Sequence, residues 1–522
     1  MEKKIMLIKK YIKENKKDLI IILIYAIITF IVTIFFHEKW RDEAQAWLLA
    51  RDLNPIELLK QMKYEGHPPL WHLILMPFAK LGFPYITMNI ISWFIMCISA
   101  GLLVKKAPFK TTTSILILLS SGFIYLYPVI SRSYCLIPLA IILVAIYYPK
   151  RNEEKIKYTL SVLLLAYTHI CMWGLVGILF LFFFLEQIFY TKQDKKNIKY
   201  IIIALIIATV GLACLIVILL GSMKTNDVVS VSNIAHLRIH SINQLMKLIK
   251  IYYKYIIGIL ELIEIGIFGQ IGNDVGFNLV CFIIMILFLI REFRKNKEHA
   301  IILITSCVWQ IGIYLYTNSG LSSIKANTMF LIFIFIAWID LIENNIIEKN
   351  LQNTKYEKIS ISICIFSLIL TNICGLTCML EEIDNYYSDS KQIAKFIEKN
   401  LEENAILICT NGPDPSSIIP YTKNKKFWNA KSSDYYTYMV WDKKSNGEIT
   451  IDEVMQKVKD NFTGKEPLYL IESDEEAGVT YQNSSDIVRY QEQGILSQEL
   501  YVSDIIKTIH KEETFKIYKI NL

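Results

Sequence analysis

The chain has 522 residues, of which 53% are hydrophobic and 20% charged, and its formal net charge is +7 at pH 7. A soluble protein of this length can have a similar apolar fraction, but here the apolar residues are gathered into blocks of about 20, the length of a membrane-spanning helix. The positive charge comes mainly from lysines clustered between these blocks, a pattern typical of topology determinants that argues against a nucleic-acid partner. The sequence therefore predicts a polytopic α-helical membrane protein.

Eleven apolar blocks predict eleven transmembrane helices. The segment before the first block, Met1–Lys17, is rich in lysine, which predicts a cytoplasmic N-terminus. Residues 244–268 are also apolar, but three lysines on one helical face favour a helix lying in the membrane interface. A further crossing there would also place the basic run 291–297 outside. The predicted spans are 18–36, 85–104, 111–130, 133–149, 157–171, 173–190, 200–221, 275–290, 299–317, 326–346 and 359–380.

The last predicted span ends a transmembrane domain at residues 1–380 and leaves a tail at 381–522. Because the N-terminus is predicted to be cytoplasmic and the number of crossings is odd, the tail is expected to be extracytoplasmic. The tail is polar and long enough for one small domain. Its helical and strand patterns predict an α/β fold. The expected elements are helices at 388–401 and 451–462 and strands at 405–410, 467–472 and 514–520.

The loop after the first span concentrates charged and aromatic residues at the outer membrane surface, in the segments 37–47 and 64–71. Residues 70–81 are apolar but too few to cross, which favours an interfacial or re-entrant helix. Asp42 and Glu43 are adjacent, so on a helix they diverge by about 100° and cannot both face one ligand atom. Two prolines fix the presentation of His67. Taken singly, these side chains also fit interfacial anchors.

As a set, the loop residues resemble a known superfamily. An Asp-Glu pair just after the first span, followed about 25 residues later by His-Pro-Pro-Leu, resembles the GT-C membrane glycosyltransferases. The likeness is greatest to the protein O-mannosyltransferase, aminoarabinose transferase and related bacterial families. It implies a plasma-membrane enzyme that takes a hexose or pentose from a polyprenyl-phosphate donor, with inversion. The acceptor would be a cell-envelope glycan, lipid or protein on the outer face.

The resemblance assigns the catalytic base to the acidic residue of the first outer loop, here Asp42. The chemistry agrees, because a lipid phosphate is a good leaving group and needs cations, while the acceptor hydroxyl needs a carboxylate to take its proton. Glu43 is expected to assist or orient, and His67 to line the same cavity.

Four further residues are candidates for substrate binding. Arg132, in the second outer loop, fits a phosphate clamp and equally an interfacial anchor. His169 belongs to a Tyr-Thr-His element similar to that of many relatives, but a bond to a neighbouring helix also explains it. Lys325 stands where relatives often carry Arg and is a candidate phosphate contact. Arg238 lies in a loop that either contacts the lipid phosphate or acceptor, or is simply solvated.

No cofactor is predicted; a divalent cation stays open as an alternative, but a bound metal is not part of the prediction. Metal-using oligosaccharyltransferases of the superfamily carry acidic residues in the second outer loop, and this loop has none. Two other functions stay open: a transporter or flippase for lipid-linked glycans, and an inactive scaffold that binds cell-wall polymer. The spans have almost no charge at their midpoints and the chain has no repeat, which argues against a transporter.

Overall fold

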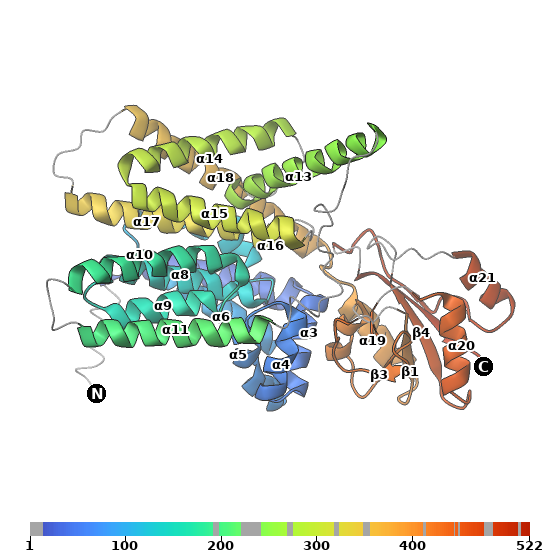
Figure 1. Cartoon of the computed structure of the whole chain (residues 1–522). Helices are drawn as coiled ribbons and strands as arrows, with labels where there is room; N and C mark the ends of the chain where they lie inside the picture. Colours follow the sequence, from blue (N-terminus) through green and yellow to red (C-terminus); the bar gives the residue numbers. More distant parts are fainter. Residues whose placement is uncertain are drawn as a thin grey trace.

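The protein consists of a bundle of long helices and a smaller domain built on a sheet, which lies at one end of the bundle (Figure 1). This computed structural model describes residues 14–191, 198–220, 242–268, 275–317, 323–347, 355–410, 414–442, 444–446, 449–473, 484–509 and 513–522.

Nine helical segments in the described part of the chain are long and apolar enough to cross a membrane, and each coincides with a predicted span. The protein is thus a multi-pass membrane protein. The helices that supply these segments are α2 (Lys16–Ile31), α6 (Thr87–Lys106), α8 (Leu136–Tyr147), α10 (Trp173–Thr191), α11 (Ile198–Leu220), α14 (Val275–Lys295), α15 (Lys297–Thr317), α17 (Thr328–Ile347) and α18 (Lys355–Asp384).

The two other predicted spans form shorter helices. The span predicted at 111–130 contains α7 (Thr111–Leu118), which ends where the Ser120 hydroxyl donates to the Ile117 carbonyl, 2.6 Å away. The span predicted at 157–171 contains α9 (Lys155–Ala166), which ends where the Thr168 hydroxyl donates to the Leu165 carbonyl. The helical pattern is interrupted at 119–120 and 167–169, which leaves irregular backbone within the bundle.

Residues 244–268 belong to one helix, α13 (Ile242–Phe268), which packs against α14, α17 and α18. The short helix α16 (Ser323–Ala326) precedes α17 and also contacts α13. That α13 lies in the membrane interface remains a prediction.

The first loop folds into three short helices, α3 (Arg41–Asp52), α4 (Pro55–Glu65) and α5 (Leu70–Lys80), of which the last coincides with the helix predicted at 70–81. The Asn54 side chain caps α4 through the backbone N–H groups of residues 56 and 57. Gly66 ends this helix in the left-handed conformation, with φ of 67°, where a side chain would be strained. This turn directs the chain through His67 into α5.

The C-terminal domain is a six-stranded sheet covered by helices on both faces. The strand order is β3-β2-β1-β4-β6-β5, with β1 parallel to β2 and β4 and the other pairs antiparallel. The strands are β1 (Ile406–Cys409), β2 (Lys426–Asn429), β3 (Asp434–Tyr435), β4 (Leu468–Ser473), β5 (Tyr501–Val502) and β6 (Phe515–Ile520). The helices are α19 (Ser390–Asn400), α20 (Ile451–Asn461) and α21 (Ser484–Glu492).

Alternation along β1 divides this domain into two cores. Leu407 and Cys409 point into the core beneath α19, whereas Ile406 and Ile408 point into the core beneath α20 and α21. Leu48 of α3 belongs to the α19 core, so the domain packs directly on the first loop. The five elements predicted in the tail are present, while β2, β3, β5 and α21 are additional.

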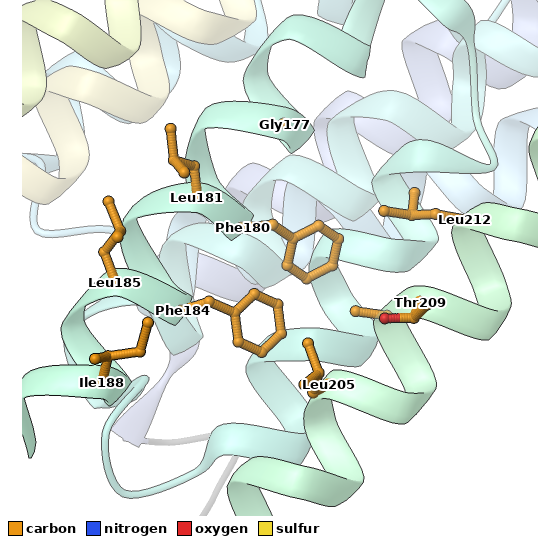
Figure 2. Close-up of a pocket in the computed structure, with 10 residues that line it drawn as sticks. Gly177, Phe180, Leu181, Phe184, Leu185, Ile188, Leu205, Thr209 and Leu212 are labelled. Carbon is orange, nitrogen blue, oxygen red and sulfur yellow. The ribbon is translucent and has the colours of Figure 1, made fainter. Parts of the chain in front are cut away.

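An apolar groove of about 470 Å³ lies between the membrane helices α10 and α11. Figure 2 shows Phe180 and Phe184 directed toward Leu205 and Thr209 across it. Another apolar cavity, of about 140 Å³, lies among α7, α14, α17 and α18. Neither is lined by residues of the first loop, and apolar grooves of this kind are expected on surfaces that face lipid chains.

Candidate active site

Asp42 and Glu43 form the first turn of α3. The Glu43 carboxylate accepts from the Trp40 backbone N–H at 3.3 Å, as an acidic residue at this position of a helix commonly does. Negative charge here also complements the positive end of the helix dipole. Because neighbouring side chains on a helix diverge, the two carboxylates enter different surroundings.

Asp42 pairs with Arg132, so the first and second predicted outer loops meet at these two side chains. The Asp42 Oδ2 lies 2.8 Å from the Arg132 Nη1, and the side chains are 25% and 11% exposed. The guanidinium also lies over the rings of Trp40 and Tyr134. Burial would raise the pKa of Asp42, but the positive charge of Arg132, followed by that of Arg41, outweighs burial and lowers it. Asp42 is therefore ionised at neutral pH.

His67 and His169 extend the same cluster. The Arg132 Nη2 lies 3.4 Å from the His67 Nε2, and the ring centroids of His67 and His169 are 5.0 Å apart. Tyr134 stacks near His169, with centroids 4.5 Å apart. Burial and the charge of Arg132 lower the pKa of His67 to about 3, so His67 is neutral at physiological pH.

The His169 ring has one free donor. Its Nδ1 accepts from the Cys171 backbone N–H at 3.2 Å, which assigns the ring hydrogen to Nε2. Nε2 is buried and has no hydrogen-bond partner in the described part of the chain. Burial without a partner is costly, so this N–H is a candidate donor to a ligand oxygen.

Lys325, on α16, is close enough for its charge to act on both Asp42 and His67. The structure thus brings together Asp42, Arg132, His67, His169 and Lys325. The predicted residue Arg238 lies outside the described residues.

Glu43 faces away from this cluster into a fully buried network. Its carboxylate accepts from the His37 Nε2, at 3.0 and 3.1 Å, and from the Ser131 backbone N–H at 2.7 Å. The His37 Nδ1 lies 2.8 Å from Glu382 on α18, and Glu382 also accepts from the Tyr125 hydroxyl at 2.5 Å. Carboxylates only accept, so His37 donates from both nitrogens and is an imidazolium.

The electrostatics agree with a charged His37. Burial alone would lower the pKa of His37, but Glu43 and Glu382 outweigh burial and raise it to about 10. Sequence reasoning did not single out His37 or Glu382. A signal was present, because Glu382 is an acidic residue at the end of an apolar block.

Glu65 is a second carboxyl group near Asp42 that sequence reasoning missed. It accepts from the side-chain amides of Gln45, at 2.9 Å, and Gln61, at 3.3 Å. Burial raises the pKa of Glu65 to about 7, with a smaller contribution from the negative charge of Asp42.

The C-terminal domain contacts the same helix that carries Asp42. The Gln45 amide donates to the Met439 carbonyl at 2.7 Å and accepts from the Met439 N–H at 2.9 Å. The Glu513 carboxylate accepts from the Arg41 backbone N–H at 2.6 Å. The first turns of α3 are therefore fixed on one side by the bundle and on the other by this domain.

Comparison with known proteins identifies no sequence relative: no protein-family model and no curated protein matches the chain. Among solved structures, the chain is similar to the crystal structure of ArnT from Cupriavidus metallidurans in the apo state. The two share 11% sequence identity over 97% of this chain and 98% of that chain, with a TM-score of 0.48.

Proposed function

We propose that this protein is an inverting glycosyltransferase of GT-C type. It moves a sugar from a polyprenyl-phosphate donor to an acceptor on the outer face of the membrane. The observation that carries the proposal is the pairing of Asp42 with Arg132, a carboxylate and a guanidinium from two loops in one partly open cluster. These are the two groups that sugar transfer from a lipid phosphate requires: an acid–base group and an anion clamp.

Arg132 and Lys325 supply the positive charge for the donor phosphate. A guanidinium can hold two phosphate oxygens at once, and Arg132 already directs its two terminal nitrogens to separate partners, Asp42 and His67. Phosphate oxygens would take the place of Asp42 on this guanidinium and free its carboxylate. The neutral His67 and the free N–H of His169 are then hydrogen-bonding groups for the sugar or the phosphate.

Asp42 acts as the base. As the acceptor oxygen attacks the anomeric carbon, the bond from that carbon to the phosphate oxygen breaks and its electron pair leaves with the phosphate. The acceptor hydroxyl proton passes to the Asp42 carboxylate. A single displacement of this kind inverts the anomeric configuration.

Glu43 has a positioning role in this scheme. It holds the backbone N–H of Ser131, the residue before Arg132, and it belongs to the helical turn that presents Asp42. The Glu43 carboxylate thereby fixes the distance between the base and the phosphate clamp.

The predicted topology puts the proposed active site on the outer side of the membrane. With residues 1–380 as the transmembrane domain and a cytoplasmic N-terminus, Asp42 faces outward at the membrane surface. The domain formed by 381–522 is then extracytoplasmic and lies beside the site, where an envelope acceptor arrives.

The test uses purified full-length protein with a panel of polyprenyl-phosphate hexoses and pentoses, with release of polyprenyl phosphate as the readout. We expect Asp42→Asn to lower turnover by about 10²- to 10⁴-fold, the usual contribution of a general base. Asp52→Asn is the matched control, since Asp52 pairs with Arg51 at the far end of α3. Equal turnover by wild type and a folded Asp42→Asn protein would exclude Asp42 as the base. Transbilayer movement of the donor in liposomes without any transfer would instead indicate a flippase.

A further inference from the structure

A second cluster of buried ionisable side chains lies where α14, α15 and α17 meet, apart from the Asp42 cluster. Glu292, His299 and Asp340 are 0%, 1% and 5% exposed, and one potential ligand atom from each lies within 4.8 Å of the others. We propose that these three residues form a binding site for a divalent transition-metal ion, Zn²⁺ in the first instance. The proposal is independent of the glycosyltransferase function.

Neighbouring lysine and arginine side chains bond some of the carboxylate oxygens in this cluster but not all of them. Lys295 Nζ donates to Asp340 Oδ2 at 2.8 Å, and Arg291 Nη2 lies 3.7 Å from the same oxygen. Arg291 also donates to Glu292 Oε1. The other oxygen of Glu292, Oε2, is buried and has no hydrogen-bond partner among the residues that the structure describes. A buried carboxylate oxygen without a partner is costly, and a cation in front of it would satisfy it.

His299 brings a buried imidazole ring to the cluster. Its Nε2 lies 3.2 Å from Glu343 Oε2, and the same oxygen accepts from the Asn296 amide at 3.0 Å. Both ring nitrogens are buried, and neither has a hydrogen-bond partner of good geometry among the described residues. Either nitrogen is therefore available to a metal ion, and imidazole nitrogen is a common ligand of Zn²⁺.

The neighbouring cations fit the role of outer partners. Ligating carboxylates are themselves usually hydrogen-bonded, as Glu292 is by Arg291 and Asp340 is by Lys295. Three carboxylates, with Glu343 included, and two cations leave one negative charge in the cluster uncompensated. A divalent ion would more than offset that charge and would give the buried Glu292 Oε2 a partner.

The donor set selects the class of metal. One imidazole and two carboxylates, without a thiolate, suit Zn²⁺ or Mn²⁺ better than Mg²⁺, which prefers oxygen ligands alone. Bonds of about 2.1 Å place neighbouring ligand atoms of a tetrahedral ion roughly 3.4 Å apart. The ligand atoms here lie within 4.8 Å of one another, so the side chains must close by up to about 1.4 Å. The ion would join three membrane helices at the end that the basic residues predict to be cytoplasmic.

The experiment measures metal in the purified full-length protein. The protein is stripped with chelator in detergent, equilibrated with Zn²⁺, desalted and analysed by elemental mass spectrometry. We expect one Zn²⁺ per chain, a higher thermal midpoint with Zn²⁺, and at least 10-fold weaker binding by Glu292→Gln and His299→Gln. Glu298→Gln is the matched control, because Glu298 lies at the same helix end but accepts from the Tyr148 hydroxyl instead.

Cobalt substitution of the wild type keeps the proposal testable if a variant fails to fold. Co²⁺ bound by nitrogen and oxygen ligands gives visible ligand-field bands without a thiolate-to-metal charge-transfer band. Three results would overturn the proposal: less than half an ion per wild-type chain at saturating Zn²⁺, equal binding by folded Glu292→Gln protein, or a thiolate band, which would place the ion on the cysteines.

Discussion

The His37 Nδ1 lies 2.8 Å from the Glu382 Oε1, so the residue just after the first membrane helix is bonded to the end of the last one. The opposite nitrogen of the same ring holds Glu43. One buried imidazolium therefore connects the bundle to the helical turn that presents Asp42. Removing one partner from a buried ion pair is costly because the remaining charge stays buried.

Substitution of His37 is expected to destabilise the protein strongly. We expect His37→Gln to lose about 3–5 kcal/mol, since it leaves Glu43 and Glu382 without their cation. The folded-state pKa of His37 is raised to about 10, so its stabilising contribution is complete below about pH 6.5 and is lost as pH rises toward 10. Thermal melts in detergent from pH 6 to 10 measure this loss.

The matched control for His37 is His72→Gln, because burial and the charge of Arg132 lower the pKa of His72 to about 4 and keep it neutral over that range. If the melting temperatures of the wild type and of His37→Gln depended on pH in the same way, His37 would not be a stabilising imidazolium in the folded protein.

Arg132 is expected to affect both phosphate binding and the ionisation of Asp42. Arg132→Gln should lower kcat/KM by roughly 10²- to 10³-fold, the usual effect of losing one group that stabilises developing negative charge. Since Arg132 lowers the pKa of Asp42, its removal should also move the acid limb of the pH–rate profile to higher pH. Arg132→Lys keeps the charge and should leave the limb nearer its original position.

Arg51→Gln is the control for Arg132, since Arg51 pairs with Asp52 at the other end of α3. An unchanged acid limb in Arg132→Gln would mean that a group other than Asp42 titrates in the reaction.

Local sequence patterns were enough to predict the longer regular elements of the fold. Apolar block length located nine membrane helices, and alternation located β1, β4 and β6 in the tail. The very short strands β3 and β5 carry too few residues for any periodicity. The breaks after α7 and α9 lie inside continuous apolar blocks, so block length and composition do not reveal them.

Part of the candidate site could also be predicted from local sequence patterns. Asp42 and Arg132 could be proposed from their positions in predicted outer loops, but their contact depends on how two loops fold. The adjacency of Asp42 and Glu43 correctly implied different surroundings. The partners of Glu43 could not be foreseen, because His37 and Glu382 are separated by almost the whole bundle in sequence and meet only through packing.

Glu65 is expected to make stability depend on pH in a lower range than His37 does. Its pKa is raised to about 7 by burial, so between about pH 4.5 and 7 the unfolded chain loses its proton before the folded chain does. Stability should therefore fall as pH rises through this range. Glu65→Gln keeps the shape and removes the titration, so its melting temperature should be flatter from pH 5 to 8. Parallel curves for the two proteins would exclude Glu65 as the titrating group.

Gln45 is expected to couple the C-terminal domain to the site, because its amide bonds both backbone groups of Met439 and also Glu65. Gln45→Met keeps the length of the side chain but leaves buried polar groups without partners, at about 1–3 kcal/mol each. We expect faster amide hydrogen exchange in residues 436–442, while exchange in β1 and β4 is unchanged because the sheet has its own core. Gln61→Met removes a bond to Glu65 without touching the domain and should leave that exchange as in the wild type. Equal protection of 436–442 in Gln45→Met and the wild type would show that packing around Leu48, rather than the Gln45 amide, holds the domain against α3.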